Sequence, residues 1–133
     1  MRNPERAPPG YNAAGDPPVG KTVLIIEDEP FLAEEMAELV GALGMVVVGP
    51  YPSTRLALAA LEGTSVNCGM LDINLNGENS FRVADLLVER QVPFLFMSGY
   101  SREVLPTRFT SQPMLKKPIM LAELRVFLEA MLA

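Results

Sequence analysis

A chain of 133 residues, 49% hydrophobic and 20% charged, is long enough to form one globular domain with a core of its own. Its net charge of -5 argues against nucleic acid or an anionic membrane as the main partner, so we expect it to bind neither. The absence of histidine excludes His-based zinc sites, Ser-His-Asp triads and a phosphohistidine on this chain. Cys68 is the only cysteine, so no internal disulfide can form; this fits a reducing compartment, and we expect a cytoplasmic protein.

Residues 1–20 differ in composition from the rest of the chain. They hold five of the twelve prolines and almost no large apolar side chains, and they contain no apolar stretch typical of a signal peptide. We therefore expect residues 1–20 to be a disordered tail and residues 21–133 to form the single folded domain.

From Lys21 onward, apolar runs typical of strands alternate with patterns typical of helices. The run KTVLIIE at 21–27 is continuous and rich in β-branched residues, as in a strand buried on both faces. Pro30 suits a first helical turn, and Gly44 suits the end of that helix. Further strands are expected at 45–49, 65–72, 92–98 and 113–117, and further helices after a cap at Ser53 or Thr54, over 81–88, over 100–109 and over 120–132. The helix at 100–109 is expected to be short or frayed because Pro106 interrupts it. This alternation predicts an α/β fold with a doubly wound, five-stranded parallel sheet.

Polar residues end four of these strands, and the carboxyl ends of parallel strands share one edge of a sheet. Glu27 and Asp28 follow the first strand, Asp72 ends the third, Ser98 ends the fourth and Lys117 ends the fifth. Because clustered carboxylates repel one another, they need a shared proton or a cation, and oxygen ligands in an open site favour Mg²⁺. A carboxylate is also a covalent acceptor of phosphoryl groups, for which a lysine and a hydroxyl supply charge and a hydrogen bond. The pattern therefore predicts that Asp72 is a nucleophile that accepts a phosphoryl group beside a magnesium ion.

The motifs LIIEDEP, LDINL, FMSGY and LKKP, in this order, resemble the receiver domain of two-component response regulators over residues 21–133. The resemblance implies a CheY-like, flavodoxin-like (βα)5 fold with strand order 2-1-3-4-5. It also implies that a histidine kinase or a histidine phosphotransfer protein phosphorylates Asp72, with Ser98 and Lys117 assisting. The Mg²⁺ site that it implies has Asp28, Asp72 and the backbone carbonyl of Asn74 as ligands, with Glu27 acting on the metal mostly through water. A cis peptide bond before Pro118 is a further implication.

The stretch PFLFMSGY is similar to a subclass of receivers with Phe-Ala-Thr-Gly-Tyr or Phe-Ala-Thr-Gly-Gly on strand four, often free-standing and found in alphaproteobacteria. Two positions depart from the usual receiver pattern. Met114 stands where an aromatic switch residue is usual, and Asn76 stands where a proline usually follows strand three. In place of a rotating ring, we hypothesise that phosphorylation orders the segment from Gly99 to Phe109.

Several neighbours of the site residues are expected to have structural roles only. Glu29 is expected to cap the helix that follows it, and Lys116 to be a solvated surface charge. Met114 is expected to pack in the core, and Cys68 to be a buried, unreactive thiol.

The expected function is that of a single-domain response regulator that is not an enzyme, although it catalyses its own phosphorylation and autodephosphorylation. No output domain follows the receiver in this sequence, so we expect the signal to pass to a downstream target protein, or the protein to act as a phosphate sink. The resemblance places target binding on the surface around the fourth helix, fifth strand and fifth helix.

The sequence leaves two alternative functions open. The first is a receiver-like interaction module that works without phosphorylation, for which the departure at Met114 leaves room. The second is an aspartyl-nucleophile phosphatase of the haloacid dehalogenase type. Such enzymes need a second acid two residues after the nucleophile, and that position is Asn74, which cannot act as a general acid.

Overall fold

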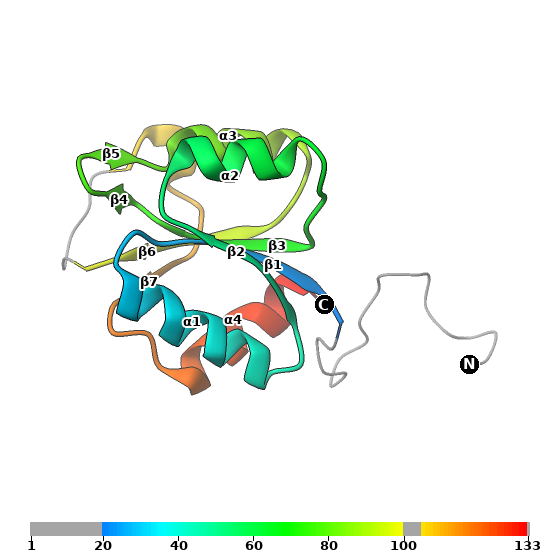
Figure 1. Ribbon diagram of the computed structural model, residues 1–133. Coiled ribbons are helices and arrows are strands. Elements are labelled where there is room, and N and C mark those ends of the chain that lie inside the picture. Colours follow the sequence, from blue (N-terminus) through cyan, green and yellow to red (C-terminus); the bar gives the residue numbers. More distant parts are fainter. Residues whose placement is uncertain (1–19, 100–104, 133) are drawn as a thin grey trace.

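The computed structural model describes residues 20–99 and 105–132, which form a five-stranded parallel sheet with helices on both faces (Figure 1). Its strands are β1 (Thr22–Ile26), β2 (Val46–Tyr51), β3 (Cys68–Asp72), β6 (Phe94–Ser98) and β7 (Met114–Lys116). The α-helices of the described residues are α1 (Pro30–Ala42), α2 (Thr54–Leu61), α3 (Phe81–Glu89) and α4 (Leu121–Leu132). The sheet order β2-β1-β3-β6-β7 confirms the expected flavodoxin-like order, because β6 and β7 are the fourth and fifth strands of the sheet.

The sheet separates two apolar layers. Helices α1 and α4 cover one face, and α2 and α3 cover the other (Figure 1). Side chains of one strand alternate between the layers, so that Ile25 packs toward α1 and α4, whereas Leu24 and Ile26 pack toward α2 and α3. Burial on both faces explains why β1 and β3 read as continuous apolar runs in the sequence.

Helix boundaries follow the capping residues. Pro30 is the first residue of α1, and the Glu29 side chain caps that helix by accepting hydrogen bonds from the backbone N–H groups of Phe31 and Leu32. The expected capping role of Glu29 is thus confirmed. Ser53 caps α2 in the same manner through the N–H of Leu56.

Strand boundaries differ from the expected ones where proline or a side chain interferes with the ladder. Strand β2 runs to Tyr51 and includes Pro50, which an edge strand tolerates because one side of its backbone has no partner strand. Strand β3 begins at Cys68, later than expected, because the Asn67 side chain accepts the Thr22 N–H at 2.8 Å. Strand β6 begins only after Pro93, which has no N–H to donate to the ladder.

A small antiparallel hairpin follows β3 and was not expected as a pair of strands. It consists of β4 (Asn74–Leu75) and β5 (Glu78–Asn79), joined by Asn76 and Gly77, which both have positive φ values of 53° and 97°. Two such residues in sequence are the requirement of a type I′ turn, which Asn-Gly meets best. The hairpin lies on the side of the molecule at which the strands of the main sheet end (Figure 1).

The helix at 100–109, expected to be short or frayed because of Pro106, is reduced to a single turn in its described part. Residues 100–104 lie outside the described residues, and of the remainder only η1 (Thr107–Phe109) is helical, as a single 3₁₀ turn. Pro106 precedes this turn and prevents an α-helix from running through it. Arg108 binds Asp85 of α3 through two hydrogen bonds of 2.8 and 3.0 Å, so this turn is tied to the helix beside it.

The described part of the segment ends in an aromatic cluster. Phe109 is 1% exposed, and its ring centroid lies 5.5 Å from that of Phe81, 6.3 Å from that of Phe94 and 5.4 Å from that of Phe96. The contacts of Phe109 with Phe94 and Phe96 are edge-to-face, and such contacts add to the free energy gained by burying the rings. The segment after β6 is therefore anchored at Phe109, and the hypothesis that phosphorylation orders it remains a prediction for residues 100–104.

The expectation that Met114 packs in the core is wrong. Along β7 only Leu115 is buried, whereas Met114 is 36% exposed, because alternate residues of a strand face opposite sides of the sheet. Cys68, in contrast, is fully buried as expected, and burial raises the pKa of its thiol to about 12.

Most of the N-terminal segment and the last residue of the chain lie outside the described residues. The expected tail at residues 1–20 falls, except for Gly20, on residues that the structure does not describe, and so does Ala133. Within residues 20–99 and 105–132, none of the helices has the length and apolar character needed to span a bilayer.

Replacing Phe109 with alanine should remove the anchor of the segment after β6. We expect the free energy of unfolding to fall by about 3–5 kcal/mol, the usual loss when a buried phenylalanine is truncated. Val126→Ala, at a 64% exposed position of α4, serves as the control and should change stability by less than about 0.5 kcal/mol. Urea unfolding followed by circular dichroism measures both, and equal effects of the two substitutions would contradict the packing role of Phe109.

Candidate phosphoacceptor and metal site

Three carboxylates meet at the carboxyl end of the sheet. Glu27 and Asp28 directly follow β1, and Asp72 is the last residue of β3, which pairs with β1 so that Ile26 lies beside Leu71. Each acid offers one oxygen atom, and these three oxygens lie within 4.8 Å of one another. Glu27 and Asp72 are buried, whereas Asp28 is half-buried. A compact set of oxygen donors with one partly exposed member fits a hard divalent cation such as Mg²⁺.

The ammonium group of Lys117 lies between two of these acids. Its Nζ is 2.5 Å from Oε1 of Glu27 and 2.8 Å from Oδ2 of Asp72. Lys117 directly follows β7, and the peptide bond from Lys117 to Pro118 is cis, as the resemblance implied. The structure thus brings together residues that are 90 and 45 positions apart in the sequence.

Burial and charge act in opposite directions on this ion pair. Burial disfavours the charge on Lys117, but its hydrogen bonds to Asp72 and Glu27, together with the attraction of their charges, outweigh burial and raise the pKa of the amine. Burial raises the pKa of the Glu27 carboxyl, although the hydrogen bond from Lys117 partly offsets this effect. At neutral pH the amine therefore stays charged and compensates the two buried acids.

The second carboxylate oxygen of each buried acid also accepts a hydrogen bond, whereas the carboxylate of Asp28 accepts none from the described residues. Oδ1 of Asp72 accepts the N–H of Asn74 at 3.2 Å, and Oε2 of Glu27 accepts the N–H of Glu29 at 3.0 Å. Within the described residues no group donates to the carboxylate of Asp28. Asp28 is therefore the acid that could bind a cation without giving up a hydrogen bond.

An open pocket of about 530 Å³ gives solvent access to these groups. Its lining includes every expected metal-ligating residue together with Lys117 and Gly99. It also includes Leu32, Asn76 and Gly77, which were not expected there. The Asn-Gly pair was a recognisable turn signal directly after Asp72, and the hairpin that it forms brings both residues to the pocket.

Ser98 lies at the expected strand end but is not among the residues that line this pocket. It is the last residue of β6 and is 1% exposed. Its backbone carbonyl accepts the N–H of Lys117 at 2.8 Å, which joins the ends of β6 and β7. Lys116, the last residue of β7, is exposed, as expected for a surface charge.

Known proteins are similar to this chain in sequence and in fold. A family profile described as the response regulator receiver domain matches residues 23–129. The positive alginate biosynthesis regulatory protein of Pseudomonas aeruginosa is 38% identical over 73 residues, which are 53% of this chain and 29% of that protein. The phyllosphere-induced regulator PhyR of Methylorubrum extorquens is 36% identical over 87 residues, which are 62% of this chain and 32% of that protein.

One solved structure is similar to this chain over nearly the whole length of the solved protein. The solution structure of SdrG from Sphingomonas melonis Fr1 is 34% identical and superposes with a TM-score of 0.76, covering 86% of this chain and 98% of that one. The chain spans about a third of the length of the two regulatory proteins above, at 29% and 32%. The similarity to those two proteins therefore concerns one region of each.

Substituting Lys117 with methionine should destabilise the protein at neutral pH. The change leaves Glu27 and Asp72 buried without a cation, and we expect a loss of about 2 kcal/mol, below the range for fully buried pairs because the pocket is open to water. Without the lysine, the raised pKa of Glu27 rises further. The folded variant then favours protonated Glu27. The loss of stability should therefore be present at pH values above the pKa of Glu27 in the variant, and it should shrink as the pH falls through that pKa.

Lys116→Met is the matched control, since it removes a lysine from the adjacent, exposed position. It should change stability by less than about 0.5 kcal/mol at any pH. Urea unfolding of both variants between pH 5 and pH 8 measures the difference. A loss for Lys117→Met that does not depend on pH would contradict the assigned compensation of buried acids.

Proposed function

Because this chain belongs to the family of response regulator receiver domains, we propose that it is a signalling protein whose Asp72 accepts a phosphoryl group from a phosphohistidine. The observation that carries this proposal is the position of Asp72. Its carboxylate lies in an open pocket, with Glu27 and Asp28 beside it and the Lys117 ammonium 2.8 Å away. A carboxylate held against a positive charge and exposed to a pocket is arranged to attack a phosphorus atom.

The proposed transfer exchanges one bond to phosphorus for another. A carboxylate oxygen of Asp72 forms the new P–O bond, the P–N bond of the phosphohistidine breaks, and the histidine nitrogen keeps the electron pair. The product on this chain is an acyl phosphate, which a water molecule later cleaves to inorganic phosphate and free Asp72. Lys117 is placed to stabilise charge on the phosphoryl oxygens.

We propose that the site works with Mg²⁺, held by Glu27, Asp28, Asp72 and the backbone carbonyl of Asn74. The compact oxygen set and the unpartnered carboxylate of Asp28 support this choice of ligands. When bound, the ion neutralises phosphoryl oxygens. We further propose that the Ser98 hydroxyl hydrogen-bonds a phosphoryl oxygen after a local shift at the end of β6, because Ser98 is buried beside Gly99, which lines the pocket.

We propose a histidine kinase or a histidine phosphotransfer protein as the donor, and a target protein bound on the surface of β7 and α4 as one route of output. Large apolar side chains of β7, of α4 and of the residue before α4 are exposed to solvent, and Met114 faces the side of the sheet opposite to α4, because its neighbour Leu115 packs in the layer of α1 and α4. They are Met114, Met120, Leu121 and Val126, with exposed fractions of 36%, 61%, 40% and 64%. An exposed apolar group of this kind is a common feature of protein interaction sites.

Incubation with Mg²⁺ and acetyl phosphate should add one phosphoryl group, and Asp72→Asn should abolish the addition. Intact-protein mass spectrometry measures the increment directly. Asp85→Asn is the control, because Asp85 is an exposed acid of α3 outside the pocket and the amide oxygen can still accept one of the two hydrogen bonds from Arg108. The control should take up phosphate as the unmodified protein does.

Three results would contradict the proposal. Uptake that survives Asp72→Asn would move the acceptor elsewhere. Steady turnover of a generic phosphate ester would favour the phosphatase alternative. Equal target binding by the unmodified protein and Asp72→Ala, in the presence of acetyl phosphate, would favour a module that works without phosphorylation.

A further inference from the structure

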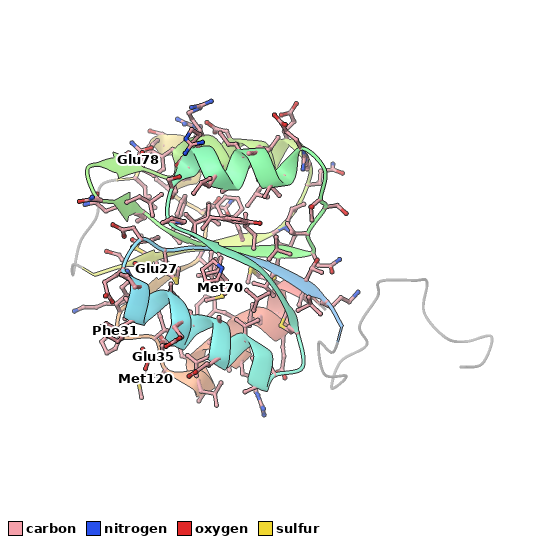
Figure 2. The ribbon with its side chains drawn as sticks, in the orientation of Figure 1. Glu27, Phe31, Glu35, Met70, Glu78 and Met120 are labelled. Carbon is pink, nitrogen blue, oxygen red and sulfur yellow. The ribbon has the colours of Figure 1, made fainter. Side chains whose placement is uncertain are left out.

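The hairpin that carries Asn74 is attached to the first residue of α2. The backbone N–H of Thr54 donates to Oε1 of Glu78 at 3.1 Å, and the Thr54 hydroxyl donates to the backbone carbonyl of Asn79 at 3.1 Å. Thr54 is 5% exposed, so both bonds are shielded from water on its side. Figure 2 shows Glu78 beside the first turn of α2, on the side of the molecule where Glu27 also lies.

Of the two bonds of Thr54, the one from its N–H satisfies a free N–H group of the first turn of α2, whereas the one from its hydroxyl is not needed for capping. Ser53 already caps the helix by accepting the N–H of Leu56. The Thr54 hydroxyl contributes nothing to the helix, since its acceptor belongs to β5. The contact therefore fixes the hairpin with respect to α2.

The pairing of the hairpin connects this contact to the phosphoacceptor. Asn74 pairs with Asn79, and Leu75 pairs with Glu78 next to the two-residue turn. In such a hairpin the pair nearest the turn exchanges backbone hydrogen bonds, whereas the N–H and C=O groups of the next pair point outward. The outward N–H of Asn74 reaches Oδ1 of Asp72, and the outward C=O of Asn79 reaches Thr54.

We propose that Thr54, together with Glu78, is a positioning residue for the phosphoacceptor site. Thr54 holds β5, β5 holds β4, and β4 holds the backbone of Asn74 against Asp72. The effect on Mg²⁺ binding rests on the proposed function, because the carbonyl of Asn74 is a proposed Mg²⁺ ligand. Neither Thr54 nor Glu78 lines the pocket with the acids, so the effect passes through the hairpin.

Thr54→Val removes the hydroxyl and keeps the shape of the side chain, and it should weaken Mg²⁺ binding. We expect the dissociation constant for Mg²⁺, from chemical-shift titration of backbone amides, to rise about tenfold, the low end for residues that orient metal ligands from outside. Thr54→Ser keeps the hydroxyl and should restore binding to within about twofold of the unmodified protein. Glu78→Ala should weaken binding, whereas Glu78→Gln, which keeps an acceptor oxygen, should not.

Ser53→Ala is the matched control for a purely structural effect. It removes the cap of the same helix from the adjacent residue and leaves both bonds of Thr54 intact. It should lower the melting temperature without changing the dissociation constant for Mg²⁺. An equal change of the dissociation constant for Mg²⁺ in Ser53→Ala and Thr54→Val, or no change of it in either variant, would overturn the inference.

A second measurement needs no metal and separates this inference from the proposed function. In the metal-free protein, exchange of the Asn74 amide proton with water should be several-fold faster in Thr54→Val than in Ser53→Ala or the unmodified protein. Faster exchange without any Mg²⁺ binding would support the attachment and refute the proposed metal site. Unchanged exchange in Thr54→Val would refute the attachment even if Mg²⁺ binds.

Discussion

The contact of one ammonium group with two buried carboxylates is the interaction on which this site depends. Glu27 and Asp72 would repel each other at the end of adjacent strands, and Lys117 lies between them at 2.5 and 2.8 Å. The parallel sheet makes this contact possible, because β1, β3 and β7 all end at the same edge. The apolar strand interiors fix the positions of these ends, so the geometry of the site follows from the packing of the core. Loss of that packing would separate the three charges and leave two acids uncompensated.

The same acids that bind Lys117 are those that a cation would need. Both oxygens of Glu27 and both oxygens of Asp72 accept hydrogen bonds, whereas the carboxylate of Asp28 accepts none from the described residues. Mg²⁺ binding would therefore compete with Lys117 for part of the negative charge. We expect this competition to make the affinity for the ion modest and responsive to changes in the pocket, which suits the proposed role of the site as a phosphoacceptor.

The sequence predicted the parts of the fold that depend on local pattern and missed those that depend on distant contacts. Strand β1 and the position of Asp72 follow from continuous apolar runs that end in acids, and these predictions are confirmed. The exposure of Met114 was missed, because a three-residue edge strand gives too short a pattern to tell which side faces the core. The bonds from Thr54 to Glu78 and Asn79 join residues 24 and 25 positions apart, and no spacing in the sequence indicates them.

The segment after β6 links the pocket to the core by its two described ends. Gly99 lines the pocket, and Phe109 is packed among Phe81, Phe94 and Phe96, while Arg108 is bonded to Asp85 of α3. In this protein an exposed methionine, rather than a ring, stands on the adjacent strand β7. A rotating aromatic side chain at that position is therefore excluded, and the hypothesis that phosphorylation orders the segment from Gly99 to Phe109 takes its place.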